Sequence, residues 1–285
     1  MGTYFAIVTC RNSEDDIHAA LASFKNQTLA PQYVIVVDDG STDKTSKILS
    51  EISQDWPSLY VITHNDLGYD ISRVVKNWNE AITYSKNKGL MSTTYHMIAT
   101  DDTIYSPGYA KQLVEFMDSN PNVAIASGNY SKNVPDKPHG AGRFVRSSFF
   151  EQTQWRGLYP ELMGYESAIL YESQRLGHQY VVLKDATFRH SRQLGTHHKF
   201  YEFGASMKKL GYHPVFAWGR FAKYLATGEV TGRIGAFNML YYYLSYTPKT
   251  TGYDRLYDER LRRFIRENQK RRMFSFLSGS ERRKN

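Results

Sequence analysis

The sequence predicts an α/β fold, with a mostly parallel sheet flanked by helices and a helical extension at the C-terminal end. Short apolar runs alternate with longer amphipathic stretches over the first half of the chain, which is typical of parallel strands connected by helices. Residues 33–37 are apolar throughout, as expected of a strand buried on both faces. Hydrophobic residues make up 41% of the chain, which is enough to fill the core of such a domain.

Capping and turn residues give the boundaries of the expected elements. Asn12 and Ser13 are suited to cap one helix, and Pro107 is suited to begin another. Gly40 allows the sharp turn that follows the second strand. We expect strands at residues 4–9, 33–37, 59–63, 94–100 and 123–127, and intervening helices that end near residues 26, 52, 86 and 119.

The regular pattern is interrupted at residues 128–157, where Pro and Gly are frequent and aromatic residues are common. Such a connection is usually functional or unstructured. Two interpretations of this segment remain open: it forms a β-hairpin packed on the sheet, or it forms part of an acceptor pocket. Beyond it we expect a helix at 166–176, a strand at 180–183, His190 in a loop, a helix around 200–210 and a charged helix at about 253–272. This pattern predicts a main domain at residues 1–212 and a helical extension at residues 213–285.

Two strands of the predicted sheet end in paired aspartates. Asp38 and Asp39 follow the second strand, and Asp101 and Asp102 follow the fourth. We expect these strands to be neighbours, so that Asp39 and Asp101 flank one crevice at the carboxyl edge of the sheet, where open α/β folds bind ligands. Either pair alone could simply cap the next helix. Together they suggest a site for a nucleotide and a divalent cation, because hard oxygen ligands suit Mg²⁺ or Mn²⁺.

The positive charge of the chain is concentrated at its C-terminal end. Residues 260–285 contain ten Lys or Arg and two Glu, which accounts for the whole net charge of +8. The remainder is neutral, so we expect no nucleic acid partner. Because Met273, Phe274 and Phe276 lie among these cations, the segment is suited to an anionic membrane surface. A solvated basic tail is the alternative.

Cysteine content and hydropathy indicate the compartment. The only cysteine, Cys10, excludes an internal disulfide framework and suits a reducing environment. No apolar run approaches the roughly 18 residues that would span a bilayer, and the chain enters a strand directly without a signal peptide. We expect a cytoplasmic protein, with peripheral attachment to the inner face of the membrane as the further option.

The motifs, taken in order, resemble those of family 2 of the inverting glycosyltransferases, from residue 3 to about residue 190. The most specific segment is Asp38-Asp39-Gly40-Ser41-Thr42-Asp43 with Gln27-Thr28 upstream; looser ones are Thr100-Asp101-Asp102 with Pro107, Glu166 with Leu170, and Asp185 before His190. The resemblance implies the GT-A (Rossmann-like) fold, with residues 1–212 as the nucleotide-sugar-binding and catalytic domain. It also implies transfer of a hexosyl-type sugar from a nucleotide-diphosphate donor, UDP-sugar being favoured, to a hydroxyl of a glycan or lipid-linked acceptor, as in polysaccharide biosynthesis.

The resemblance assigns residues to the nucleotide site. Thr9, Asn12 and Asp39, with Asp38 beside it, would hold the base and ribose. Arg73 or Lys76 would complete that pocket, although Lys76-Asn77 replaces the family's usual Arg-Asn pair.

The resemblance also implies a site for Mn²⁺ or Mg²⁺. Asp101 would be the main metal ligand, Asp102 would contact the ribose or support the metal, and His190 would be a further ligand. The family motif has two aspartates separated by one residue, and Ala99 occupies the first of these positions.

The family's general base lies in a Glu-Asp pair four residues before a leucine. Here the pair reads Glu166-Ser167 before Leu170, so Glu166 is the nearest carboxylate, and Glu161 and Asp185 are rivals. The base would remove the proton of the acceptor hydroxyl during attack, while the metal neutralises the leaving diphosphate.

Two other functions stay open at this point. A member that binds nucleotide sugar without turnover is suggested by Ala99 and Ser167. A sugar-nucleotide pyrophosphorylase would have a related fold, but the sequence lacks a Gly-rich N-terminal phosphate loop with its Lys and Arg.

Overall fold

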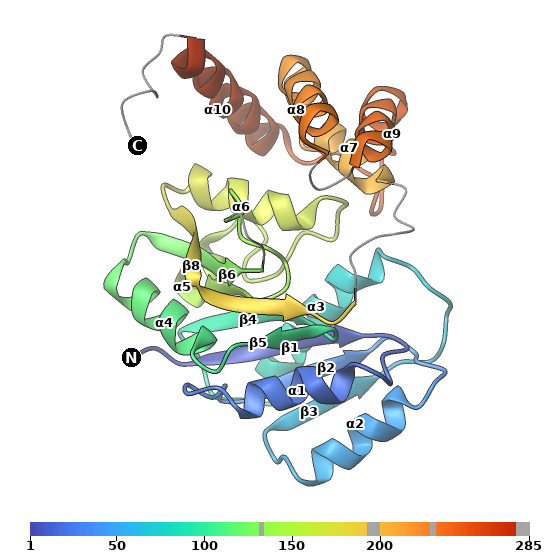
Figure 1. Cartoon of the computed structure of the whole chain (residues 1–285), viewed down its shortest axis with the longest axis vertical. Helices are drawn as coiled ribbons and strands as arrows, with labels where there is room; N and C mark the ends of the chain where they lie inside the picture. The colour runs from blue at the N-terminus through green and yellow to red at the C-terminus, as the bar shows by residue number, and fades with distance from the viewer. Residues whose placement is uncertain (131–133, 193–199, 229–231, 278–285) are drawn as a thin grey trace. The chain divides into compact units, whose positions relative to one another are not determined.

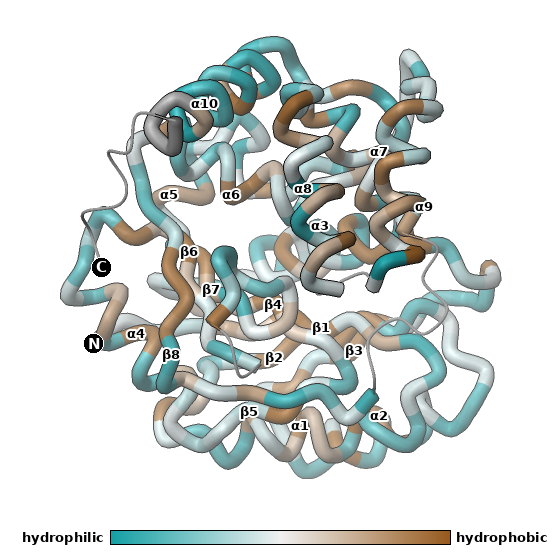
Figure 2. The backbone as a smooth tube through the Cα atoms, turned by 45° about the horizontal axis from the view of Figure 1, so that its top comes forward, coloured by the Kyte–Doolittle hydropathy of each residue, from teal (hydrophilic) through white to brown (hydrophobic). Residues whose placement is uncertain are grey.

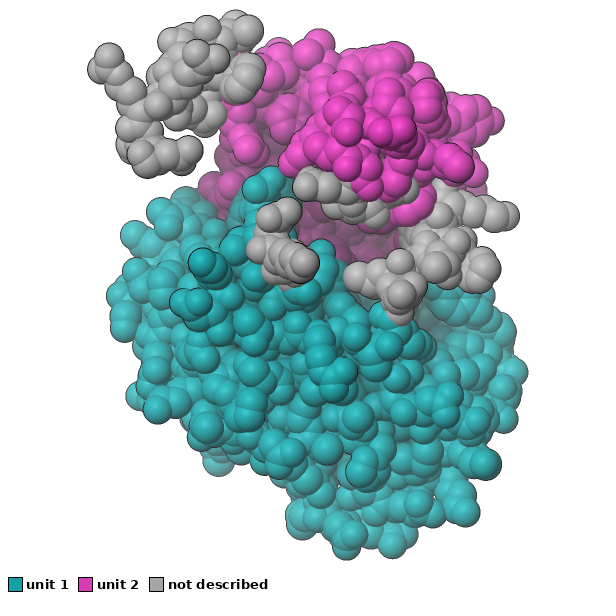
Figure 3. Space-filling view, in the orientation of Figure 1, with its two compact units in different colours: residues 1–160, 176–194 teal, residues 161–175, 195–285 magenta. Residues whose placement is uncertain are grey.

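The computed structural model describes residues 1–130, 134–192, 200–228 and 232–277. These residues group into two compact units, shown in separate colours in Figure 3. The first comprises Met1–Pro160 and Leu176–Leu194, and the second comprises Glu161–Arg175 and Gly195–Asn285.

The first unit is built on an eight-stranded sheet in the order β3-β2-β1-β4-β7-β6-β8-β5 (Figure 1). Strands β1 to β4 run parallel, β7 is antiparallel to β4 and β6, β8 is parallel to β6, and β5 is antiparallel to β8. The predicted α/β fold with a mostly parallel sheet is thereby confirmed. The strands are β1 (Tyr4–Cys10), β2 (Val34–Asp38), β3 (Leu59–Thr63), β4 (Tyr95–Thr100), β5 (Thr103–Tyr105), β6 (Val123–Asn129), β7 (Arg143–Arg146) and β8 (Gln179–His190).

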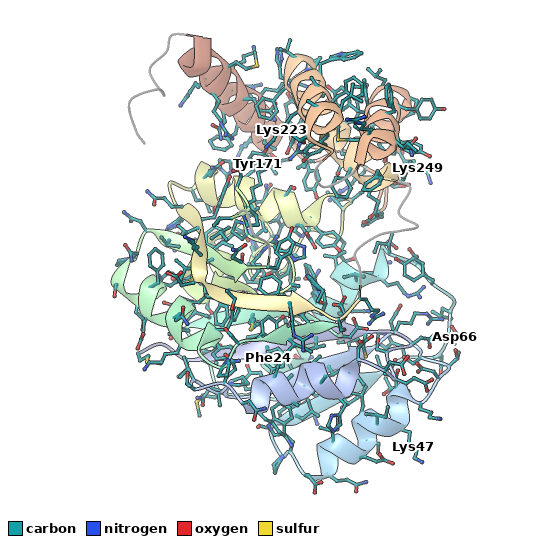
Figure 4. All side chains as sticks on the ribbon, in the orientation of Figure 1. Phe24, Lys47, Asp66, Tyr171, Lys223 and Lys249 are labelled. Carbon is teal, nitrogen blue, oxygen red and sulfur yellow. The ribbon has the colours of Figure 1, made fainter. Side chains whose placement is uncertain are left out.

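Helices connect these strands and cover the central ones. In the helix after β1, Ile17, Leu21 and Phe24 recur at the spacing of one helical face and are buried against the sheet; Figure 4 labels Phe24. Because helices cover both faces, β1 and β2 are apolar at nearly every position. The helices of this unit are α1 (Ile17–Lys25), α2 (Thr45–Gln54), α3 (Arg73–Asn87), α4 (Tyr109–Ser119) and α5 (Ser147–Gln152).

The irregular segment at residues 128–157 contains a strand of the sheet. Strand β7 pairs antiparallel with both β6 and β4, so it is part of the sheet itself and does not belong to a β-hairpin packed on the sheet. The sequence did not indicate a central strand, because β7 has only four residues and an arginine at each end. Arg143 is nevertheless buried, and its guanidinium donates to the carbonyl of Pro138 at 2.9 Å.

Strand β8 is longer than expected. It continues from the expected strand at 180–183 to His190, so the prediction that His190 lies in a loop is wrong. The extension alternates exposed positions with the buried Ala186 and Phe188, which is the pattern of a strand with one buried face. His190 pairs in register with Thr103 of β5.

The second unit is helical. Helix α9 packs on α7 and α8, and α10 packs on α6. A cluster of Met163, Ala205 and Tyr246 forms one of its cores. Because α6 and α7 group with the C-terminal helices, the compact units differ from the expected division at residue 212. Its helices are α6 (Tyr165–Arg175), α7 (Tyr201–Lys209), α8 (Pro214–Thr227), α9 (Gly232–Ser245) and α10 (Glu259–Leu277).

Candidate active site

The two acid turns lie at one edge of the sheet, on either side of β1. Cys10 at the end of β1 is in register with Asp38, and Thr9 is in register with Thr100, the last residue of β4. The strands that carry the acids are therefore not neighbours as expected, because β1 lies between them. Their carboxyl ends still meet at the same edge.

The segment that follows β1 joins the two turns. The Asp39 N–H donates to the carbonyl of Cys10 at 3.0 Å, and Arg11 donates to the carbonyl of Gly40 at 2.8 Å. On the other side, the hydroxyl of Ser13 donates to the carboxylate of Asp101. Burial raises the pKa of the Cys10 thiol, and the carboxylates of both turns raise it further. The two turns therefore form one electrostatic cluster.

Asp38 is a structural residue of the first turn. It is fully buried, and its carboxylate accepts hydrogen bonds from the N–H of Ser41 at 2.9 Å and from the hydroxyls of Ser41 and Ser46. Gly40 is required in the same turn, since its φ is +72° and a Cβ there would lie 2.6 Å from the carbonyl oxygen of Asn65. This arrangement corrects the expected nucleotide contact of Asp38, because its carboxylate has no exposed surface.

Asp39 is half-buried in the same turn, where it accepts a fork of hydrogen bonds from Arg73. Nε of Arg73 lies 2.9 Å from Oδ1, and Nη2 lies 2.8 Å from Oδ2. His64 lies 3.7 Å from Oδ1 and also contacts Glu80 at 2.8 Å. Burial raises the pKa of Asp39, but hydrogen bonds from Arg73 and Asn77 outweigh it and hold the pKa below its ordinary value. Asp39 is therefore ionised at neutral pH.

The other expected nucleotide residues differ in their placement. The Asn12 side chain accepts a hydrogen bond from the N–H of Thr42 at 2.8 Å, which fixes the loop after β1 to the first acid turn. Thr9 is half-buried near the end of β1. Lys76 is exposed on α3, one turn beyond Arg73. Of the two expected basic residues, Arg73 is the one that binds Asp39.

Asp101 is held by a residue that the sequence analysis missed. Arg192 lies 2.9 Å from Oδ2 of Asp101 and 2.9 Å from the carboxylate of Asp16. Burial raises the pKa of Asp101, and hydrogen bonding by Ser13 together with the charge of Arg192 opposes the rise. The position of Arg192 just beyond His190 was the only signal in the sequence.

Asp102 and His190 form a second pair. Oδ1 of Asp102 accepts a hydrogen bond from Thr100 at 2.7 Å and lies 3.4 Å from Nδ1 of His190. Burial raises the pKa of Asp102, but His190 and Thr100 together hold it at about 2. The hydroxyl of Thr103 is 3.2 Å from the same ring nitrogen. Nε2 of His190 is buried and has no hydrogen-bond partner among the described residues.

A second histidine from the irregular segment lies beside this pair. The ring of His139 is 5.3 Å from that of His190, and burial lowers the pKa of His139 to about 4. The sequence analysis did not include His139, because it lies in the middle of the 128–157 connection without a recognisable motif.

These residues fit a cation that is shared with a substrate. Within the described ranges, no three His, Cys, Asp or Glu side chains converge as a metal cage. A cation that also binds substrate phosphates needs only one or two carboxylates from the protein. Asp102 is ionised, and because Nδ1 of His190 faces Asp102, the buried Nε2 is the ring nitrogen left to coordinate a cation.

Glu166 lies in the first turn of α6, in the second unit. It is half-buried, and Leu170 one turn later is buried. The rivals Glu161 and Asp185 are exposed, the former just before α6 and the latter on β8. A carboxylate in a first helical turn is also favoured by the helix dipole, so the role of Glu166 as a base stays a proposal.

Comparison with known protein families identifies the family to which this chain belongs. Residues 5–179 match the model of Glycosyl transferase family 2, and the match spans well over half of the chain. The chain belongs to glycosyl transferase family 2. The matched residues include both acid turns and Glu166. The expected family is confirmed.

Individual relatives agree with this assignment. An uncharacterized glycosyltransferase of Haemophilus influenzae is 29% identical over 136 residues, which are 47% of this chain and 38% of that protein. The mannosyltransferase PcManGT of Pyrobaculum calidifontis, solved with GDP-Man and Mn²⁺, superposes with a TM-score of 0.57 at 16% identity, over 86% of this chain and 70% of that one. TarS 1–349 of S. aureus, solved with UDP-GlcNAc, gives 0.54 at 18% identity, over 85% and 71%.

These likenesses show the GT-A fold. The aligned part of this family 2 chain spans 43% of the longer TarS structure and 38% of the Haemophilus relative.

Proposed function

We propose that this family 2 glycosyltransferase moves a sugar from a nucleotide-diphosphate donor, with a UDP-sugar preferred, to a hydroxyl of a glycan or lipid-linked acceptor, inverting the anomeric centre with the help of Mn²⁺ or Mg²⁺. One observation carries the proposal. The Asp39–Arg73 pair and the Asp102–His190 pair flank the end of β1, where Arg11 and Ser13 connect the two acid turns. A base and a diphosphate can then occupy the two sides of one site.

The Asp39 side selects the base. An ionised carboxylate accepts hydrogen bonds and donates none. It therefore suits uracil, thymine or guanine, which carry a ring N–H on their pairing edge, and disfavours adenine and cytosine. Arg73 fixes the orientation of the carboxylate, and Thr9 lies on the adjacent strand. The relatives solved with UDP-GlcNAc and with GDP-Man support donors of this class.

The Asp102 side receives the diphosphate. We assign Asp102 and His190 as the metal ligands, and we revise the expected role of Asp101, because its carboxylate is bound by Ser13 and Arg192. A bound Mn²⁺ or Mg²⁺ supplies neutralisation of the charge that develops on the leaving diphosphate. The relative solved with Mn²⁺ supports use of a divalent ion.

Glu166 is the proposed general base. Inversion requires the acceptor hydroxyl to attack from the face opposite the diphosphate, and a carboxylate that removes its proton accelerates this step by about 10²–10⁴-fold. Glu166→Gln should reduce kcat by that factor while leaving donor binding intact. Glu161→Gln and Asp185→Asn are the matched variants for the two rivals.

The position of Ala99 gives less support to the alternative that this chain binds nucleotide sugar without catalysing transfer. Ala99 is fully buried in β4, between β1 and β7. A carboxylate at that position would lie within the sheet, so the alanine removes no surface ligand.

Release of nucleoside diphosphate from a panel of UDP-, GDP-, TDP- and ADP-sugars, with and without Mn²⁺, tests the proposal. We expect turnover that requires Mn²⁺, is highest with a UDP-sugar and is lowest with ADP-sugars. Nuclear magnetic resonance of the product should show the opposite anomeric configuration to the donor. Tight donor binding without turnover under any acceptor condition would support the non-catalytic alternative, and equal use of ADP-sugars would contradict the role of Asp39.

A further inference from the structure

Helices α8 and α9 expose apolar side chains along the faces that lie toward solvent. On α8, Val215, Trp218 and Ala222 follow one another at helical spacing and are exposed. The exposed apolar residues of α9 follow the same rule, with spacings of three and four. They are Ile234, Phe237, Tyr241 and Leu244, of which Ile234 is 80% exposed.

The opposite faces of the two helices already form the core of the second unit. Ala236, Met239, Leu240 and Tyr243 of α9 are buried, and α9 packs on α7 and α8. Helix α9 is therefore apolar on both its buried and its exposed side. A helix of this kind normally has a partner on every face, and here only part of its surface is covered by the described chain.

The two exposed stripes join into one surface. The ring of Phe221 on α8 lies 5.8 Å from that of Trp218 and 5.1 Å from that of Phe237 on α9. Figure 2 shows hydrophobic stretches along both helices, whereas α10 is mainly hydrophilic. We call this surface, made of the seven exposed residues named above, the α8–α9 face. Contiguous apolar patches that remain exposed usually mark an interaction site.

Cations accompany the α8–α9 face. Neither α8 nor α9 contains an aspartate or glutamate, and each carries an exposed cation, Lys223 (Figure 4) and Arg233. Helix α10 of the same unit contains seven Lys or Arg and two Glu. Its exposed cations include Arg260, Arg263 and Lys270. An apolar and aromatic surface whose two helices also carry exposed cations, Lys223 and Arg233, matches the composition of helices that lie in the interface of a bilayer.

We propose that the α8–α9 face docks on an anionic lipid surface, with Trp218, Ile234 and Phe237 entering the headgroup boundary and the cations of α8, α9 and α10 contacting lipid phosphates. A second copy of the chain fits less well, because a symmetric interface would bring like charges together. No helix in the described part of the chain is both long and apolar enough to cross a membrane, so the contact is interfacial. The apolar anchor thus comes from α8 and α9, outside the basic segment at 260–285.

Vesicle flotation of the full chain tests the proposal. We compare phosphatidylcholine vesicles with vesicles enriched in phosphatidylglycerol, and wild type with Ile234→Ser/Phe237→Ser. Met91→Ser is the matched control, because Met91 is 63% exposed in the first unit. Wild type and the control should bind anionic vesicles equally, and the double variant should bind about tenfold more weakly or worse. Its thermal unfolding should be unchanged, since both side chains are exposed.

Charge reversal and fluorescence give independent readouts. Arg260→Glu/Arg263→Glu should weaken binding to anionic vesicles and reduce its dependence on salt. Brominated lipids should quench part of the tryptophan emission of the wild type, and this quenching should be absent in Trp218→Phe. Equal vesicle binding by wild type and Ile234→Ser/Phe237→Ser would overturn the proposal. The proposal would also be overturned if the wild type forms a dimer that binds no vesicles and if Ile234→Ser/Phe237→Ser is monomeric. The α8–α9 face would then be an interface between copies of the chain.

Discussion

At the level of single residues, the adjacent aspartates Asp38 and Asp39 of one motif have different roles. Successive side chains at the end of a strand point to opposite sides, so Asp38 enters the core and Asp39 is partly exposed. The sequence predicted that both belong to the site, but it did not indicate which one is buried. The contacts of Ser41 and Ser46 with Asp38 make this distinction.

Substitution of the two aspartates should separate stability from binding. Asp38→Ala leaves three partly buried donors of Ser41 and Ser46 without their acceptor, so we expect a loss of about 2–4 kcal/mol in the free energy of unfolding by urea. Asp39→Asn keeps the shape of the turn, so it should lower UDP affinity at least about tenfold in calorimetry with a smaller change in stability. Unchanged UDP affinity in Asp39→Asn would contradict the assignment of the base pocket.

Asp102 should make the stability of the protein depend on pH in a defined window. Its pKa in the folded protein is about 2, below the ordinary value of 3.8, so ionisation favours the folded state. This stabilisation, about 2 kcal/mol, is complete above pH 4 and is lost as the pH falls toward 2. Asp102→Asn should therefore be less stable than wild type at pH 6, and the difference should shrink below pH 4. A difference that stays constant down to pH 2.5 would contradict this account.

At the level of elements, the sequence predicted the strands and helices that have a clear period and missed those that do not. The strands after residues 3, 33, 58 and 94 were recognisable because they are apolar and end in turn residues. Strand β7 was missed because it has only four residues and begins and ends with arginine, and the end of β8 was missed because its polar residues resemble a loop. The position of β1 between β2 and β4 depends on long-range pairing, which no local pattern specifies.

The packing of α7 on α9 depends on a glycine. A Cβ at Gly204 would lie 2.3 Å from the carbonyl oxygen of Met239, so the two helices could not keep their present separation. We expect Gly204→Ala to lower the melting temperature by several degrees. Gly219→Ala is the control, because nothing lies within 4 Å of a Cβ there, and the better helix propensity of alanine should leave the protein as stable or more stable. Equal melting temperatures for both variants would contradict this packing.

At the level of the whole molecule, the residues assigned to the nucleotide and cation lie in the first unit, and Glu166 and the α8–α9 face lie in the second. The sequence predicted the acid turns, because strand ends share a sheet edge. It did not predict Arg192 or His139, since each reaches the site only through the tertiary fold. The concentration of charge near the C-terminus predicted the cations of α10, whereas the exposed faces of α8 and α9 required the structure.

A buried histidine should make the whole protein sensitive to mild acid. His96 on β4 is enclosed with Tyr159 and Phe150, and burial lowers its pKa to about 3. The unfolded chain takes up a proton near pH 6.5 and the folded chain does not, so stability falls by up to about 1.4 kcal/mol per pH unit below pH 6.5. His139, with a pKa of about 4, adds to the effect. Urea unfolding of His96→Gln between pH 7 and 4 should show a shallower slope than wild type, and an identical slope would count against this explanation.

A crystal structure of the protein with UDP and Mn²⁺ would test the central claim most directly, namely that one site at the end of β1 takes a nucleotide base on one side and a diphosphate with its cation on the other. We predict that a ring N–H of uracil donates to the carboxylate of Asp39 and that Mn²⁺ is bound by Asp102 and Nε2 of His190 together with the diphosphate. A nucleotide bound with its base away from Asp39, or a cation that contacts neither Asp102 nor His190, would contradict the claim.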